Sequence, residues 1–206
     1  VLNIDPANSS SYSGIGNTIY DLSGLGNTGT LTNSPTFTGL NSGNIVLDGT
    51  NDYIEIPSIS LNTSFTIDMY CNVNNLSTTY VIVGKYGGGS YDFWLGVSGS
   101  RFKFSISMPN KFDAQTATIS ANTWYHVTAV YNASALTASI YLNGTLYTTT
   151  RTGMNTPAGS YVVIGGPPWL SSFWQGNIAS AKVYDKTLTT EQVLYNYNTQ
   201  KARFGL

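Results

Sequence analysis

The sequence predicts an all-β protein, in which two antiparallel sheets pack face to face as a sandwich and one short helix lies near the C-terminus. Two observations carry this prediction. About a dozen short apolar segments follow one another at spacings of roughly 8 to 12 residues, separated by turn-forming residues. The best defined of them, within residues 122–145, form an antiparallel hairpin, a unit that indicates layered sheets and not an α/β fold.

Length and composition suit one domain of this kind. With 206 residues the chain can bury a substantial core without disulfides or a metal ion. We expect a single domain over 1–206, divided into an irregular wrapping segment over 1–44 and a sandwich core over 45–206. Only 9% of the residues are charged, so the polar surface has to come from Ser, Thr, Asn, Gln and Tyr, which suits neutral partners.

Charge, hydropathy and cysteine content exclude several classes. The net charge is −1 and no run of Lys or Arg occurs, so we expect no nucleic-acid partner. No segment reaches the roughly 20 apolar residues of a membrane span, so we expect no membrane insertion. Cys71 stands alone and is expected to be an inert buried thiol. Because the chain begins with Val1 and shows no signal peptide, we expect a processed or excised piece of a longer protein.

The expected elements follow the distribution of turn formers and apolar runs. The segment 1–44 is rich in glycine, serine and asparagine, and we expect it to wrap irregularly around the core with one edge strand at its start. After it, β-branched and aromatic residues gather into short runs, which favours strands. Besides the hairpin, the strands that we expect are 45–47, 53–56, 64–73, 80–85, 91–97, 102–108, 116–119, 161–164 and 177–184.

The clearest alternation lies in the expected strand 64–73. Its odd-numbered residues, from Phe65 to Cys71, are apolar and share one face, whereas the even-numbered residues from Thr66 to Asn72 share the other. We expect the first face to be core and the second to meet solvent or a ligand.

The first strand of the hairpin within 122–145 projects large side chains to both of its faces. Alternate residues from 124 to 131 project to opposite sides, so both faces are expected to be covered. Trp124 and His126 belong to the interior in this interpretation. Asn143 and Gly144 suit positive φ, the requirement of a type I′ turn. The strands on either side of this turn are 136–142 and 146–150.

The expected helix has a recognisable start. Thr189 and Gln192 stand at the N-cap and third helical positions of a capping box, and Leu188 and Val193 have the spacing of a hydrophobic staple. We expect the helix over 190–198.

Four sequence blocks together resemble a known family. They are 21–31 (DLSGLGNTGTL), 46–54 (VLDGTNDYI), 124–144 with WYHV and YLNG at its ends, and 176–185 followed by Leu188 and Glu191. In this order, over nearly the whole chain, they resemble the concanavalin A-like lectin/glucanase superfamily, in the laminin G-like jelly-roll domains of bacterial and phage type. Residues 196–206 also resemble the end of laminin G-like structural proteins of large tailed phages.

The resemblance implies a jelly-roll sandwich, which commonly serves as an extracellular carbohydrate- or protein-binding module. It does not fix the function, because the same fold hosts lectins, glycosidases and structural domains. Our interpretation is a lectin-like, non-catalytic module of an extracellular or virion surface protein, with a neutral glycan as ligand. The alternative is a structural or assembly domain whose aromatic surface contacts another protein. A glycoside hydrolase is the second alternative.

The carboxylates argue against the hydrolase. Glycoside hydrolysis usually needs two carboxylates about 5 to 9.5 Å apart. The superfamily's glycosidase signature, a strand with Glu, Asp and Glu on one face, is absent, and strand 64–73 carries only Asp68. His126 has no recognisable Ser or Cys nucleophile as a partner. We therefore expect no enzyme, unless Asp68 faces a second carboxylate across a cleft.

Aromatic loop residues are the candidates for sugar binding, because a ring can stack on the apolar face of a pyranose while amides and carboxylates bond its hydroxyls. In both of the clusters that follow, the alternative is that some of the rings belong to the core. The first choice lies in the loop 165–175 and the second around the glycine turn 87–89. The candidate residues are Trp169, Phe173, Trp174 and Gln175 in the first cluster, and Tyr86, Tyr91, Asp92 and Trp94 in the second.

One short segment has the chemistry of a calcium site. Asp48, Asn51 and Asp52 offer two carboxylates and an amide, which are ligands that Ca²⁺ accepts. The same residues spell an ordinary turn, in which Asp and Asn side chains bond their own backbone. We favour the turn, and Ca²⁺ is the one cofactor that we keep as an alternative.

Overall fold

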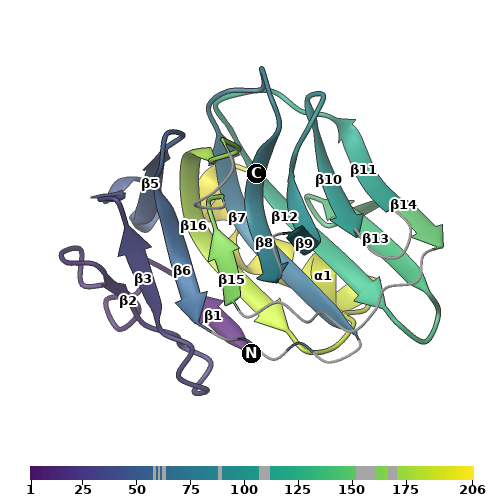
Figure 1. Ribbon diagram of the computed structural model, residues 1–206, viewed down its shortest axis with the longest axis horizontal. Coiled ribbons are helices and arrows are strands. Elements are labelled where there is room, and N and C mark those ends of the chain that lie inside the picture. The colour runs from purple at the N-terminus through teal and green to yellow at the C-terminus, as the bar shows by residue number, and fades with distance from the viewer. Residues whose placement is uncertain are drawn as a thin grey trace.

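The computed structural model describes residues 1–57, 59, 61, 64–87, 90–106, 112–151, 161–166 and 171–206, and at positions 86, 87, 90, 91, 112, 148–151 and 161 it describes the backbone alone. Two antiparallel sheets of eight strands each pack face to face (Figure 1). The predicted all-β sandwich is confirmed.

Sheet A runs in the order β14-β13-β12-β7-β16-β5-β4, with β1 paired to β16. Sheet B runs in the order β11-β10-β9-β8-β15-β6-β3-β2. The strands of sheet A are β1 (Leu2–Ile4), β4 (Thr36–Thr38), β5 (Asn44–Asp48), β7 (Phe65–Val73), β12 (Thr123–Asn132), β13 (Thr137–Leu142), β14 (Thr145–Arg151) and β16 (Gln175–Tyr184). Those of sheet B are β2 (Thr18–Ile19), β3 (Gly29–Thr32), β6 (Tyr53–Pro57), β8 (Tyr80–Gly87), β9 (Ser90–Val97), β10 (Arg101–Ile106), β11 (Phe112–Thr118) and β15 (Tyr161–Ile164).

The main core fills the space between the two sheets. Alternation along each strand directs one set of apolar side chains inward. Phe65 of β7 lies 4.5 Å from Phe93 of β9, measured between ring centroids, and meets Phe104 of β10 edge to face at 6.1 Å. Each such pair adds about 0.5–1.5 kcal/mol beyond the area it buries, so these rings tie the two sheets together.

The segment 1–44 is more regular than the sequence indicates. We expected one edge strand, whereas β1, β2, β3 and β4 all join the sheets. β1, at the start of the chain, is the strand that we expected, whereas β2, β3 and β4 were not expected, because strands of two to four residues are too short to show an alternation. Gly29 has a packing role in β3, since a Cβ there would lie 2.6 Å from Ile56 Cδ1.

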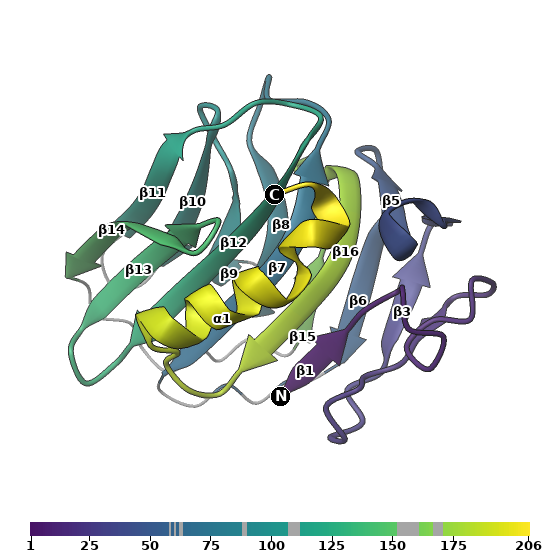
Figure 2. The same cartoon turned by 180° about the vertical axis from the view of Figure 1, so that it is seen from behind.

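The outer face of sheet A is covered by the C-terminal helices. Figure 2 shows α1 (Thr190–Gln200) lying across this face, and η2 (Lys201–Phe204) follows it. Phe204 stacks on Tyr70 with ring centroids 4.6 Å apart, and the Tyr70 hydroxyl donates to the carbonyl of Tyr197. All nine residues of β7 are consequently buried, so the expectation that its second face meets solvent or ligand is wrong.

The local signals at the hairpin and the helix are confirmed. Asn143 and Gly144 have φ values of 50° and 77°, as a type I′ turn requires. The capping box of Thr189 and Gln192 is complete in both directions, and α1 begins at the expected residue. The helix ends two residues later than expected, and the chain then leaves η2 through the left-handed residue Gly205.

Candidate functional site

The ring of Trp174, a predicted sugar contact, lies inside the sandwich. Its side chain is 0% exposed, and its Nε1 donates to the carbonyl of Asn72 at 3.1 Å. It also stacks near Phe102, with ring centroids 6.4 Å apart. Trp174 directly precedes β16, and strand alternation directs it between the sheets. Its assignment to the binding surface is therefore wrong.

Phe173 is also buried, on the other side of sheet B. It packs with Tyr53 and Val163 in a cluster separate from the main core, and its assignment to an exposed surface is wrong. Gln175 is partly exposed at the start of β16. Trp169 lies outside the described residues. Of the aromatic residues predicted in the loop 165–175, the two that the structure describes, Phe173 and Trp174, are both buried.

The second predicted cluster follows the alternation of β9. Phe93 points into the core, whereas Asp92 and Trp94 are partly exposed. The side chains of Tyr86 and Tyr91 lie outside the described residues. Close to this cluster, Lys85 is 3% exposed and its Nζ donates to the carbonyl of Ile59 at 2.9 Å.

The environment of Lys85 also reaches Asp92. Burial lowers the pKa of the Lys85 ammonium, and the negative charge of Asp92 offsets part of this effect. Asp92 therefore stabilises the charge of the buried Lys85 ammonium. This is a structural role in addition to the sugar contact that we predicted for Asp92.

The acidic turn after β5 bonds its own backbone. Asp48 Oδ1 accepts from the backbone N–H groups of Thr50 at 2.7 Å and Asn51 at 3.3 Å, and Asp52 Oδ2 accepts from the N–H of Asp48 at 3.2 Å. This is the Asx-type turn that we favoured. Within the described parts of the chain, no group of three or more His, Cys, Asp and Glu residues is arranged to hold a metal ion.

The pKa directions at this turn fit its hydrogen bonds. Burial acts to raise the pKa of Asp48, but the N–H groups of Thr50, Asn51 and Asp52 outweigh it and lower that pKa. The pKa of Asp52 is raised, chiefly by burial and further by the charge of Asp48. Calcium binding at Asp48, Asn51 and Asp52 remains the alternative to this turn, and the Discussion gives the measurement that tests it.

Asp68 forms a buried ionisable pair beneath the C-terminal helices. His126 Nε2 lies 3.0 Å from Asp68 Oδ2, and the Thr128 hydroxyl donates to the same oxygen at 2.9 Å. Asp68 is 1% exposed and His126 is fully buried. Burial would raise the pKa of Asp68, but the charge and hydrogen bond of His126, with Lys182 and Thr128, hold it below its usual range.

This pair does not have the geometry of a glycosidase site. The groups that interact with the Asp68 carboxylate include His126, Thr128, Lys182, Tyr70 and Tyr184, none of them a carboxylate, and Asp68 is 1% exposed. The condition that we set for reconsidering a hydrolase is therefore not met at Asp68. His126 is interior as expected, and Trp124 is half-buried against Phe204 at a ring distance of 4.6 Å.

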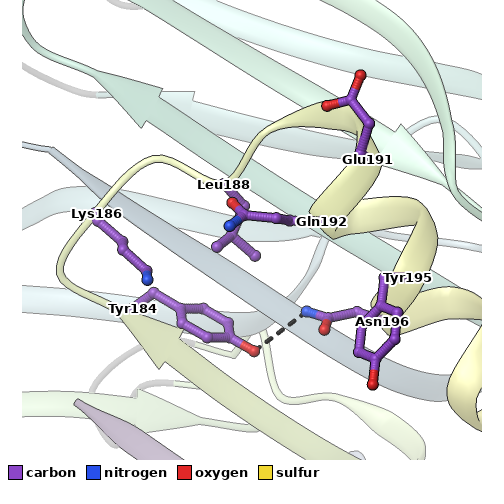
Figure 3. A pocket seen from close by; sticks show the side chains of 7 residues that line it. All are labelled: Tyr184, Lys186, Leu188, Glu191, Gln192, Tyr195 and Asn196. Carbon is purple, nitrogen blue, oxygen red and sulfur yellow. Dashed lines mark hydrogen bonds between the residues drawn. The ribbon is translucent and has the colours of Figure 1, made fainter.

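An open pocket of about 330 Å³, which we call the α1 pocket, lies between the end of β16 and the flank of α1 (Figure 3). Gln192, Tyr195 and Asn196 stand three and four residues apart, so helical periodicity places them on one side of α1. Tyr184 closes the opposite wall, and its hydroxyl accepts from Asn196 Nδ2 at 3.1 Å. The lining residues are Tyr184, Lys186, Leu188, Glu191, Gln192, Tyr195 and Asn196.

The α1 pocket combines an aromatic surface with hydrogen-bonding groups. The Tyr195 side chain is 69% exposed, whereas Leu188 is buried and forms an apolar base. Burial, and then the charge of Asp68, raise the pKa of Tyr184, so its hydroxyl stays neutral and can both donate and accept. In Figure 3 the Glu191 carboxylate points away from Tyr184. A ring beside amides and a hydroxyl suits an uncharged polyol ligand.

The α1 pocket was not predicted from the sequence. We used Gln192 only as a signal for the start of the helix, and Leu188 for that start and for the family resemblance. Tyr184 and Tyr195 are two tyrosines on either side of that start, and the helical spacing of Tyr195 and Asn196 from Gln192 is the signal that would have indicated a shared face.

Comparisons with known proteins agree with the fold. Known structures that match include the receptor-binding domain of botulinum neurotoxin type G (TM-score 0.76, 16% identity, 97% of this chain and 51% of that one) and the binding domain of Paraclostridial mosquitocidal protein 1 (TM-score 0.77, 17% identity, 97% and 52%). The binding domain of botulinum neurotoxin DC, solved in complex with rat synaptotagmin II, also matches (TM-score 0.76, 15% identity, 97% and 51%). The chain thus spans about half the length of these structures.

Sequence comparison identifies the family. None of the curated protein sequences compared with the chain matches it significantly. A laminin G-type family model, described as the concanavalin A-like lectin/glucanases superfamily, matches residues 48–194, which is most of the chain. The resemblance found in the sequence blocks is confirmed: the chain belongs to the concanavalin A-like lectin/glucanase superfamily.

Proposed function

We propose that this protein is a non-catalytic carbohydrate-binding module that holds a neutral glycan in the α1 pocket. The observation that carries the proposal is the 69% exposed ring of Tyr195 beside the amides of Gln192 and Asn196 in an open pocket. The ring offers a flat surface for the apolar face of a pyranose, and the amides both donate and accept hydrogen bonds with its hydroxyls.

The comparisons support a binding role. The chain belongs to a superfamily that includes lectins, and the solved structures that match it are titled receptor-binding or binding domains. Glu191 is the one carboxylate among the residues that line the α1 pocket, whereas glycoside hydrolysis usually uses two. As part of the same proposal, we assign the module to an extracellular or virion surface.

A glycan array tests the proposal directly. We expect the parent protein to bind at least one class of neutral glycan, and Tyr195→Ala to weaken that binding at least tenfold, which corresponds to about 1.4 kcal/mol. Tyr20→Ala is the matched control, because Tyr20 is 54% exposed in the segment 1–44 and lies outside the pocket. Absence of any glycan signal for the folded parent protein would contradict the proposal.

A structural or assembly role is the second candidate, and apolar exposure around α1 favours it. Leu194 and Tyr195 are both exposed on the helix. Leu194 lies beside the hairpin turn, because a Cβ added to Gly144 would stand 3.0 Å from Leu194 Cδ1. Leu146 on the adjacent strand is exposed as well. Loss of assembly in Leu194→Asp, together with a silent glycan array, would favour this candidate over glycan binding.

A further inference from the structure

We infer that the ligand site extends beyond the α1 pocket, across Tyr184 and onto β1, so that the protein prefers glycan chains of at least two sugar units. This inference rests on the proposed function and specifies its ligand class further. It starts from a second hollow, of about 200 Å³, next to the first. The second hollow is lined by Val1, Leu2, Asn3, Ser23, Lys182, Val183 and Tyr184.

The two hollows share one wall and open on the same face of sheet A. Tyr184 lines both. In the β1–β16 pairing Asn3 stands opposite Lys182, and Val183 points into the core. Alternation therefore places Asn3, Lys182 and Tyr184 together on the outer face, the face that α1 crosses. Figure 2 shows the end of β16 between α1 on one side and β1 on the other.

The sizes of the hollows favour a ligand that occupies both. Sites for small ligands commonly measure about 300–1,000 Å³. The α1 pocket, at about 330 Å³, lies at the lower end of this range, and the second hollow is smaller. Both hollows are open, so a single sugar in either keeps one side in water, whereas a glycan chain across Tyr184 buries surface in both.

The wall of the second hollow is fixed before any ligand arrives. The Asp21 carboxylate accepts hydrogen bonds from the backbone N–H groups of Asn3 at 2.9 Å and Asn27 at 3.0 Å. The Ser23 hydroxyl also donates to it, at 2.6 Å. These bonds also lower the pKa of Asp21, against the opposing effect of burial, so it stays ionised and holds the segment near neutral pH. A wall that needs no ordering on binding costs less free energy to use.

Lys182 and Asn3 are the lining residues of the second hollow that bring hydrogen-bond donors on long or amide side chains. Lys182 carries three ammonium N–H groups, and the Asn3 side chain adds an amide. Sugar hydroxyl and ring oxygens accept such bonds. The α1 pocket supplies the exposed ring of Tyr195, and the second hollow supplies hydrogen-bond donors. One glycan chain could therefore stack a sugar on Tyr195 and bond its next sugar to Lys182 and Asn3.

The test is a chain-length series by isothermal titration calorimetry, using the mono-, di- and trisaccharide of the best glycan on the array. We expect the disaccharide to bind at least tenfold more tightly than the monosaccharide. Affinities for all three lengths that agree within twofold would overturn the inference and leave the proposed function standing. Binding of no length would overturn both.

A substitution in the second hollow provides an independent measurement. Asn3→Tyr places a large ring on its floor, and we expect disaccharide affinity to fall at least tenfold. Asn74→Tyr is the matched control, because Asn74 is exposed just after β7, near the opposite end of β16. Unchanged disaccharide affinity in a folded Asn3→Tyr variant would overturn the inference. If Asn3→Tyr fails to fold, the chain-length series decides alone.

Discussion

The buried Asp68 carboxylate provides a sharp stability test. It is 1% exposed, it faces His126 at 3.0 Å, and it accepts from Thr128 at 2.9 Å. Hydrogen bonds to a buried charged group contribute about 1.5–3 kcal/mol each. Asp68→Asn keeps the shape and one acceptor oxygen but removes the charge that His126 and Thr128 face, so we expect a loss of about 3 kcal/mol. For a chain of this size that lowers the melting temperature by roughly 6–12 °C.

The assay is urea unfolding followed by tryptophan fluorescence at pH 7. Asp185→Asn is the matched control, because Asp185 is exposed after β16, and substitutions at exposed sites usually change stability by less than about 0.5 kcal/mol. If the free energy of unfolding of Asp68→Asn lies within about 1 kcal/mol of the parent value, the contacts of Asp68 with His126 and Thr128 do not stabilise the fold as we describe.

The pH dependence gives the same test a second readout. Because the pKa of folded Asp68 is lowered, its charge stabilises the fold above the unfolded-state pKa of about 3.9, and this stability is lost as pH falls through the folded value. Below about pH 4 the parent should therefore lose stability more steeply than Asp68→Asn. Parallel curves for the two proteins would contradict this account.

Three further predictions concern residues whose surroundings the structure defines. Trp174→Ala should lower the free energy of unfolding by about 3–5 kcal/mol, because the ring fills the core and its Nε1 bonds Asn72; a loss below about 1 kcal/mol in urea unfolding would indicate an exposed ring instead. Cys71 is fully buried and burial raises its pKa, so a thiol reagent such as DTNB should react with it in urea but not in the native protein, and rapid native labelling would contradict its burial. Because Asp48 and Asp52 already accept backbone N–H groups, Ca²⁺ and a chelator should leave the melting temperature unchanged, whereas a Ca²⁺-dependent rise that Asp52→Asn abolishes would establish the calcium site.

The fold was predictable because its signals are local. The alternation in β7, the positive-φ pair Asn143-Gly144 and the capping box at Thr189 each span ten residues or fewer. The turn and the capping box agree with the structure, and the alternation correctly gave the core face of β7 but not the burial of its other face. The four blocks that resemble the superfamily depend on the same local patterns. Apart from β1, the short strands of the segment 1–44 were not predicted, because they hold only two to four residues each.

The site was harder to predict because it depends on contacts distant in sequence. Phe173 and Trp174 are adjacent aromatics, and the sequence does not tell which side of a sheet each ring takes until the register of β16 is known. The polar face of β7 was identified from the sequence. The helices α1 and η2 that bury this face lie more than a hundred residues further along the chain, so their contact with it could not be predicted. Tyr184 and Asn196 meet only because α1 docks across sheet A.

A crystal structure of the protein with a bound di- or trisaccharide from the array tests the central claim most directly. We predict sugar density in the α1 pocket, with one ring against Tyr195 and the chain passing over Tyr184 toward Asn3. Ordered sugar elsewhere, for instance on the outer face of sheet B beside Trp94, with the α1 pocket empty, would contradict the assignment of the site.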